Sequence, residues 1–102
     1  MPPHAPDTLR VDVDEDPPRG RFTLVGDTGQ TLGQMTFSRA RDDLIIIDHT
    51  EVDDSLRGKG GGLRLFNGMV DWARNTGTKV MSTCPFANSM FERHPASRDV
   101  LT

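Results

Sequence analysis

Apolar and polar residues alternate along several stretches in the first half of the chain, and a period of two is typical of β-strands with one buried face. The predicted strands span residues 9–13, 21–25 and 30–39. We do not expect the first of them to continue into residues 14–18, which end in two prolines. Turn residues at Gly26–Gly29 predict a hairpin. After a second turn at Ala40–Asp43, four consecutive aliphatic residues open a strand over Leu44–Val52, which we expect to be covered on both faces.

The second half of the chain begins with the period of an amphipathic α-helix from Gly61 to Thr76. When residues are placed about 100° apart, the apolar side chains gather on one half of this helix: Leu63, Leu65, Phe66, Met69, Val70, Trp72 and Ala73. Gly77 is a suitable C-terminal cap, whereas Gly68 lies inside the helix, where glycine costs about 1 kcal/mol relative to alanine. A strand at residues 79–84 and a short helix at residues 86–93 follow.

This order of elements predicts an α+β fold with a mixed antiparallel and parallel sheet. The strands before and after the long helix should pair in parallel if they are neighbours in the sheet. Residues 9–102 are enough for one core, so we expect a single domain. Residues 1–8 contain three prolines and little apolar surface, and we expect them to form a flexible tail.

A glycine-rich segment with two cations joins the Leu44–Val52 strand to the long helix: Arg57, Gly58, Lys59, Gly60, Gly61 and Gly62. Glycines let a ligand approach the main chain closely, and the unpaired N–H groups at a helix start favour anions. The segment therefore predicts a phosphate site, and a loop that only turns the chain is the alternative. Asp53 and Asp54 should weaken such a site unless they cap the chain or face outward.

Two common phosphate patterns do not fit this segment. No Lys-Ser or Lys-Thr pair follows the glycines, as a P-loop requires, and Leu63 stands where the dinucleotide pattern has its third glycine. Arg57, Gly60 and Gly62 do fill the pattern Arg/Gln-x-x-Gly-x-Gly/Ala. That pattern resembles the acetyl-CoA pyrophosphate loop of the GNAT N-acetyltransferase superfamily.

Three further motifs extend the resemblance from about Arg21 to Leu101. They are His49-Thr50-Glu51-Val52, Cys84-Pro85-Phe86 and Arg93-His94-Pro95, in this order along the chain. Together they resemble the small single-domain GNAT-like acetyltransferases. The resemblance implies a shortened GNAT core with a central amphipathic helix and a short C-terminal helix. It also implies acetyl-CoA as co-substrate, no metal, and transfer of an acetyl group to an amine.

The resemblance also implies roles for particular residues. Arg57, Gly58, Lys59, Gly60, Gly61 and Gly62 correspond to the pyrophosphate loop. Val52 corresponds to the position whose main chain pairs with the pantetheine arm. A tyrosine that often acts as general acid is missing, because the chain contains no tyrosine and Met90 stands at its place. Ala96 and Ser97 also replace the usual glutamate and tyrosine.

Three residues are candidates for the chemistry of acetyl transfer, which needs a base for the amine and an acid for the departing thiolate. Glu51 and His49 are two residues apart and share one strand face, so either could take the proton. A role in tethering the loop is the alternative. Cys84 could accept the acetyl group or protonate the CoA thiolate, and the alternative is a small buried apolar residue. His94 is expected to end the last helix.

Composition limits the remaining classes of function. A net charge of -3 and a pI near 5.5 argue against a nucleic-acid partner, and no apolar run is long enough to span a membrane. The N-terminus lacks the apolar core of a signal peptide. A single cysteine excludes an internal disulfide and a multi-cysteine zinc site, and it is typical of a reducing cytoplasm.

Two functions remain. The first is a cytoplasmic acetyltransferase whose acceptor is an amine of a small molecule, a peptide or a protein. The second is a non-catalytic CoA-binding, acyl-CoA-binding or protein-interaction module. So short a chain is expected to lack the N-terminal helices that wall in the acceptor site of larger GNAT enzymes, which would leave an open groove.

Overall fold

The structure is a computed structural model that describes residues 9–56 and 58–102. The predicted tail at residues 1–8 and the predicted phosphate-binding residue Arg57 lie outside the described residues. The strands are β1 (Arg10–Asp16), β2 (Arg19–Val25), β3 (Thr31–Arg41), β4 (Leu44–Val52) and β5 (Lys79–Ser82). The helices are α1 (Gly61–Thr76) and α2 (Pro85–Arg93), with short 3-10 segments η2 (Asp54–Leu56) and η3 (Pro95–Val100).

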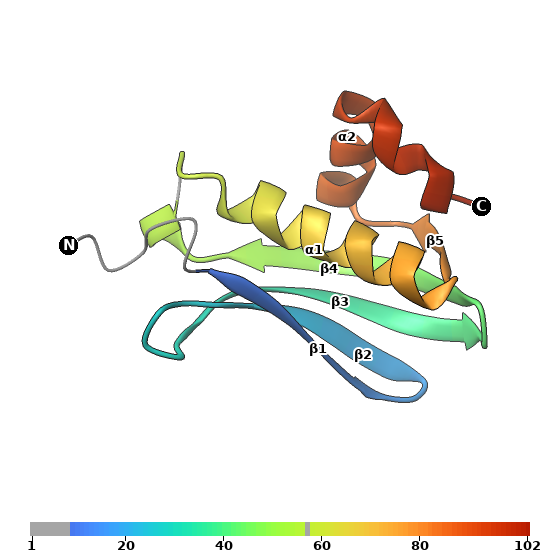
Figure 1. The fold of residues 1–102 in the computed structure, drawn as a ribbon, viewed down its shortest axis with the longest axis horizontal. Coiled ribbons are helices and arrows are strands. Elements are labelled where there is room, and N and C mark those ends of the chain that lie inside the picture. Colours follow the sequence, from blue (N-terminus) through green and yellow to red (C-terminus); the bar gives the residue numbers. More distant parts are fainter. Residues whose placement is uncertain (1–8, 57) are drawn as a thin grey trace.

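The strands form one sheet in the order β1-β2-β3-β4-β5 (Figure 1). Strands β1 to β4 are an antiparallel meander, and β5 pairs with β4 in parallel after the chain has passed through α1. The predicted α+β class, the mixed sheet and the parallel pairing are confirmed. Gly77 caps α1 in the left-handed conformation, with φ of 68°, as the sequence predicts.

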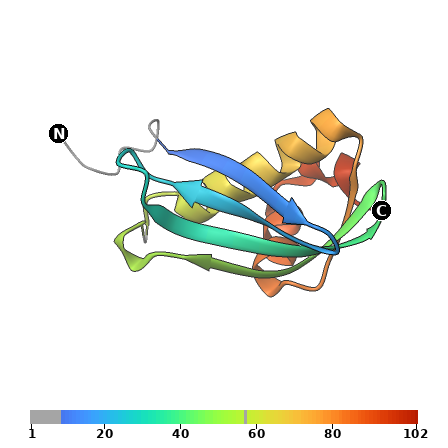
Figure 2. The ribbon, with the colours of Figure 1, turned by 90° about the horizontal axis from the view of Figure 1, so that it is seen from below.

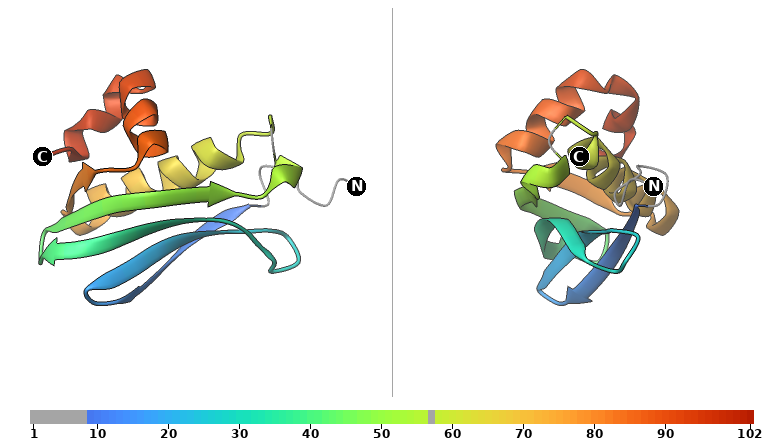
Figure 3. Two further views of the ribbon diagram at one scale, coloured as in Figure 1. Left: turned by 180° about the vertical axis from the view of Figure 1, so that it is seen from behind. Right: turned by 90° about the vertical axis from the view of Figure 1, so that its left-hand side faces the viewer.

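Both helices pack on the same face of the sheet (Figures 1 and 3). The core between these layers contains an aromatic cluster of Phe22, Phe37 and Trp72, and the rings of Phe66 and Phe91 join α1 to α2 with centroids 4.9 Å apart. Figure 2 shows the other face of the sheet without a covering helix. The expectation that β4 is covered on both faces was therefore wrong: Ile45 and Ile47 are fully buried against the helices, whereas Ile46 is only partly buried.

The glycine inside α1 has a packing explanation. A Cβ atom at Gly68 would lie 2.6 Å from Cβ of Val11, so the helix crosses β1 where a side chain has no room. Gly68 lowers the helix propensity of α1, but it allows the helix to contact the sheet closely. Leu63 departs from its predicted burial, because its side chain is 38% exposed at the start of the helix.

Strand β1 is longer than predicted, since pairing with β2 continues through Asp16 opposite Arg19. The guanidinium of Arg39 explains this extension, because its Nη2 donates to Glu15 Oε1 at 2.9 Å and its Nε donates to Oε2. Arg39 also lies over the Trp72 ring, 5.9 Å from the centroid. The acidic residue on the inner face of β1 is therefore neutralised from β3, and only the prolines at positions 17 and 18 end the strand.

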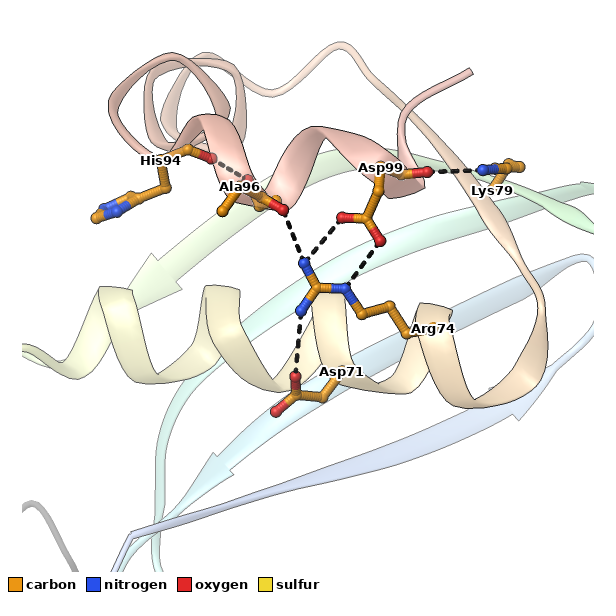
Figure 4. A network of polar contacts seen from close by, with 7 residues as sticks. Asp71, Arg74, Lys79, His94, Ala96 and Asp99 are labelled. Carbon is orange, nitrogen blue, oxygen red and sulfur yellow. Dashed lines mark hydrogen bonds and ion pairs between the residues drawn. The ribbon is translucent and has the colours of Figure 1, made fainter.

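The C-terminal segment is tied to α1 by one arginine (Figure 4). Arg74 Nη2 donates to Asp99 Oδ1 and to the carbonyl of Ala96, both at 2.8 Å, and Lys79 Nζ donates to the Asp99 carbonyl. These hydrogen bonds from Arg74 hold the pKa of Asp99 below its ordinary value. Leu101 then forms a parallel bridge with Val80. The network fixes η3, and with it the end of α2, against the body of the fold.

The Glu15–Arg39 pair predicts a loss of stability in acid. The hydrogen bond from Arg39 holds the pKa of Glu15 below its ordinary value of 4.5. The stabilisation is therefore complete above about pH 4.5 and is lost as the pH falls through the lowered pKa. We expect Glu15→Gln to lower the free energy of unfolding by about 1 kcal/mol at pH 7, and by progressively less in acid.

Denaturant unfolding from pH 7 to pH 3 measures this difference. Asp12→Asn is the matched control, since it removes a carboxylate from the same strand in a more exposed pair with Arg10. We expect it to change the stability little at any pH. The prediction would be contradicted if the free energies of unfolding of the wild type and Glu15→Gln differed by a constant amount over this pH range.

Candidate functional site

A β-bulge in β4 decides which side chains of this strand face the helices. Thr36 pairs with His49 and Phe37 pairs with Ile47, so Asp48 is an extra residue without an opposite partner in β3. An extra residue reverses the alternation of the side chains beyond it. Ile47 therefore faces the helices before the bulge, and Thr50 does so after it.

The pairing of β4 with β5 ends just before the bulge. The last paired residues are Ile47 and Ser82, and the amide of Thr83 still donates to the Ile47 carbonyl at 2.9 Å. The chain then turns away into α2, with Cys84 as its N-cap. Strand β5 therefore ends at Ser82, shorter than the predicted 79–84, and the second half of β4 has no described strand beside it on this edge.

A pocket of about 580 Å³ lies on the helix face beyond this gap. Three segments form its walls, namely the end of β4, the glycine loop with the start of α1, and one side of α2. The lining residues are Thr50, Val52, Asp53, Asp54, Leu56, Gly58, Gly60, Gly61, Gly62, Leu63, Phe86, Met90, Arg93 and His94. The sequence-predicted glycines and Val52 are thus brought together in one cavity, whereas Lys59 is exposed beside it.

The glycine loop has the geometry of an anion cradle. Gly58 and Gly60 have φ of 74° and 78°, a region that favours glycine, and Gly60 is the N-cap of α1. A Cβ at Gly61 would lie 2.9 Å from Leu56, and one at Gly62 would lie 2.8 Å from the Phe86 ring. The amides that follow the N-cap have no partner within the helix and point towards its open end. The residues present therefore fit a phosphate-bearing ligand.

Capping explains the position of Asp53, one of the two acidic residues that directly follow β4. Asp53 Oδ1 accepts a hydrogen bond from the amide of Ser55 at 2.9 Å, and the Asp53 carbonyl accepts one from Leu56. Asp53 thus caps η2, which was one of the two arrangements that would spare the anion site. Both Asp53 and Asp54 nevertheless line the pocket, so its β4 wall carries carboxylates.

Cys84 is buried next to Thr50, one of the residues that line the pocket. Its side chain is 3% exposed, and its Sγ atom is 3.3 Å from Thr50 Oγ1 in a hydrogen bond that either group can donate. Cys84 does not line the pocket itself, but its hydrogen-bond partner does.

His49 and Glu51 share one face of β4, as predicted, but the bulge turns that face away from the helices. Nε2 of His49 lies 3.0 Å from Glu51 Oε1, and the two side chains are 61% and 63% exposed. They stand on the uncovered face of the sheet, on the other side of β4 from Cys84. The structure thus separates the three candidate catalytic residues into two groups.

Sequence reasoning named several further residues of the pocket only as parts of motifs and gave them no binding role. Thr50 was passed over because its direction depends on the bulge. Phe86, Met90 and Arg93 follow a spacing of four and three residues, which places them on one face of a helix. That spacing was visible in the sequence, but which face of α2 meets the glycine loop was not. His94 both ends α2 and lines the pocket.

No group of three or more His, Cys, Asp or Glu side chains within the described ranges could hold a metal ion. None of the helices among residues 9–56 and 58–102 has the length and apolar character needed to cross a membrane.

Comparisons with known proteins agree with this geometry. Residues 21–100 match the family described as GCN5-related N-acetyl-transferase. The solution structure of a GCN5-like candidate N-acetyltransferase from Staphylococcus aureus is 30% identical, with a TM-score of 0.69 over 93% of this chain and 89% of that chain. The chain therefore belongs to the GCN5-related N-acetyltransferase family, the class of enzyme that the motifs indicate. A comparison with curated proteins finds no match.

More distant structures share the fold. A ribosomal-protein-alanine N-acetyltransferase from Brucella melitensis biovar Abortus 2308 is 20% identical, with a TM-score of 0.62 over 78% of this chain and 64% of that chain. A phosphinothricin N-acetyltransferase candidate, also 20% identical, has a TM-score of 0.57 over 78% and 54% of the two chains. This chain thus spans about half to two thirds of the length of these two proteins.

Proposed function

We propose that the chain binds acetyl-CoA in the pocket between β4, the glycine loop and α2, and that it transfers the acetyl group to an amine. One observation carries the proposal: a single cavity connects a glycine-lined helix start with the gap where β4 and β5 part. A ligand that is phosphorylated at one end and reactive at the other fits such a cavity. Family membership supports the same assignment.

The binding roles follow from the chemistry of the walls. The pyrophosphate would lie over the amides at the start of α1, where the helix dipole favours negative charge. Arg57 and Lys59 would add positive charge to the glycine loop. The pantetheine arm would run past Val52, whose strand has a free edge there, towards Thr50 and Cys84. Leu63, Phe86 and Met90 supply the apolar surface along this path.

The chemistry would involve both faces of the sheet. An acceptor amine that approaches from the uncovered face meets His49 and Glu51, either of which can take its proton directly or through water. On the helix face, Cys84 can attack the thioester carbonyl, so that its thiol proton passes to the departing CoA thiolate and an acetyl thioester forms on the cysteine. The amine would then attack this thioester through the gap where β4 and β5 part, so that a C–N bond forms and the C–S bond to Cys84 breaks. The proton that the amine loses to His49 or Glu51 would return to the Cys84 sulfur, directly or through water, and restore the thiol.

A second function is a non-catalytic CoA-binding or acyl-CoA-binding module. Two observations favour it. The chain contains no tyrosine, and Met90 lines the pocket at the position of the missing acid. In addition, His49 and Glu51 hydrogen-bond to each other on the face away from the pocket. Release of free CoA thiol from acetyl-CoA in the presence of an amine panel separates the two functions.

The glycine loop gives the first test. Gly60 has φ of 78°, and a Cβ atom added there would have nothing within 4 Å, so conformation rather than space requires glycine. A β-branched residue strains this conformation by about 1–2 kcal/mol and would turn the following amides out of line. We expect Gly60→Val to abolish CoA binding while unfolding stays cooperative, as measured by calorimetric titration and thermal melting.

Gly77→Val is the matched control, because Gly77 caps the other end of α1 with φ of 68° and equally open surroundings. It should lose similar stability and keep its affinity for CoA. The proposed binding mode would be contradicted by an NMR titration in which CoA shifts resonances of other residues but shifts none of the resonances of Gly60–Gly62.

Cys84 gives the second test. Incubation of the wild type with acetyl-CoA should leave one acetyl adduct on Cys84, removable by hydroxylamine as thioesters are, and intact-mass spectrometry detects it. Cys84→Ala should lose the adduct and the amine transfer but keep its affinity for CoA. An absent adduct in the wild type, together with full transfer in the alanine variant, would leave Cys84 as a packing residue.

A further inference from the structure

The α2 wall of the pocket changes from apolar to cationic along the helix. Phe86, Met90 and Arg93 line the pocket from the same helix face. At about 1.5 Å of rise per residue, Arg93 lies about 10 Å beyond Phe86 along the axis. The Phe86 ring is the group that a Cβ at Gly62 would meet, so the apolar end is beside the glycines. Helix α2 rises away from the sheet (Figure 1), and Arg93 is the last residue of this helix.

Arg93 is available to a ligand. Other arginines of the chain are engaged: Arg39 binds Glu15, Arg74 binds Asp99, and Arg98 donates to the Phe91 carbonyl. Arg93, in contrast, is exposed and forms no hydrogen bond or ion pair with any residue in the described ranges. Among described residues that line the pocket, it is the one with a permanent positive charge.

We propose that Arg93 binds the ribose 3′-phosphate of CoA and thereby selects CoA over its dephosphorylated form. This inference rests on the proposed binding of CoA in the same pocket. With the pyrophosphate on the glycine amides and the pantetheine arm directed to the sheet, the adenosine part leaves through the outer end. A phosphate monoester carries a charge of about -1.5 to -2 at neutral pH, and a guanidinium can bind two of its oxygens at once.

The described residues of the opposite wall offer no cation to a ligand with three phosphates. The lining residues on the side of β4 are Thr50, Val52, Asp53, Asp54 and Leu56, and two of these five are carboxylates. Arg93 reaches the cavity from the other side, so a phosphate beside it is kept apart from those carboxylates. Charge thus favours placing the monoester on the α2 wall rather than beside η2.

Calorimetric titration of the wild type and Arg93→Ala with CoA and with dephospho-CoA tests the inference. The wild type should bind CoA more tightly than dephospho-CoA, and added salt should reduce this difference in affinity because it screens the charge of the phosphate. Arg93→Ala should weaken CoA binding about 10-fold, as expected for one lost charge-assisted contact, and leave dephospho-CoA binding unchanged. Arg93→Lys should retain part of the preference, because lysine keeps the charge without the planar fork.

Arg41→Ala is the control, since it removes one exposed positive charge from the end of β3. It should bind both ligands as the wild type does. Equal weakening of CoA and dephospho-CoA by Arg93→Ala would overturn the inference and assign Arg93 to the pyrophosphate. A lower melting temperature with unchanged affinities would also overturn it, leaving Arg93 as a stabiliser of the α2 C-terminus.

These outcomes separate the inference from the proposed function. If the wild type binds CoA and Arg93→Ala binds it equally well, the proposed role of Arg93 is wrong, and the proposed binding of CoA is unaffected. If the wild type binds neither CoA nor dephospho-CoA, both proposals are overturned.

Discussion

The single extra residue in β4 is the constraint on which the site depends. Because Asp48 has no opposite partner in β3, the strand keeps Ile45 and Ile47 on the helix face and then adds Thr50 and Val52 to that same face. The aliphatic pair anchors the core, and the later pair enters the pocket. Without the bulge, simple alternation would have turned His49 and Glu51 towards the helices and Thr50 away from them.

The bulge coincides with the end of the β4–β5 ladder, and the two features together create the gap in the sheet. A strand edge without a partner exposes main-chain groups that can pair with a ligand. In this fold the exposed edge faces the start of α1, because glycines at positions 61, 62 and 68 allow the helix to approach β4, α2 and β1 closely. The glycines therefore serve both the packing of α1 and the shape of the pocket.

Polar contacts far from the pocket hold its walls in place. The Arg74–Asp99 pair joins α1 to η3, which follows directly on α2, and so it limits how far Met90 and Arg93 can move from the glycine loop. The Arg39–Glu15 pair fastens the edge strand β1 to β3 at the opposite end of the sheet. The uncovered face of the sheet, by contrast, is polar near the gap, with Thr36 bonded to Asp48 and His49 beside Glu51.

The sequence by itself determined the class of fold, the bounds of β4 and α1, the approximate bounds of the other elements and the position of the glycine loop. These depend on local properties, such as the alternation in β2 and β3, the helical period of α1 and the glycine at its C-cap. Apolar periodicity also indicated most of the core, since burial of one face follows directly from it. Leu63 was an exception, because a residue at the helix start can face the pocket instead of the sheet.

Only the tertiary structure decided the direction of the site residues. The bulge at Asp48 arises from pairing with β3, so the spacing of His49 and Glu51 could predict a shared face but not which face. Likewise, the sequence indicated a short helix at 86–93, but the docking of that helix on Phe66 of α1 selected the side that meets the glycines. Long-range register and packing set these directions, and a local pattern contains neither.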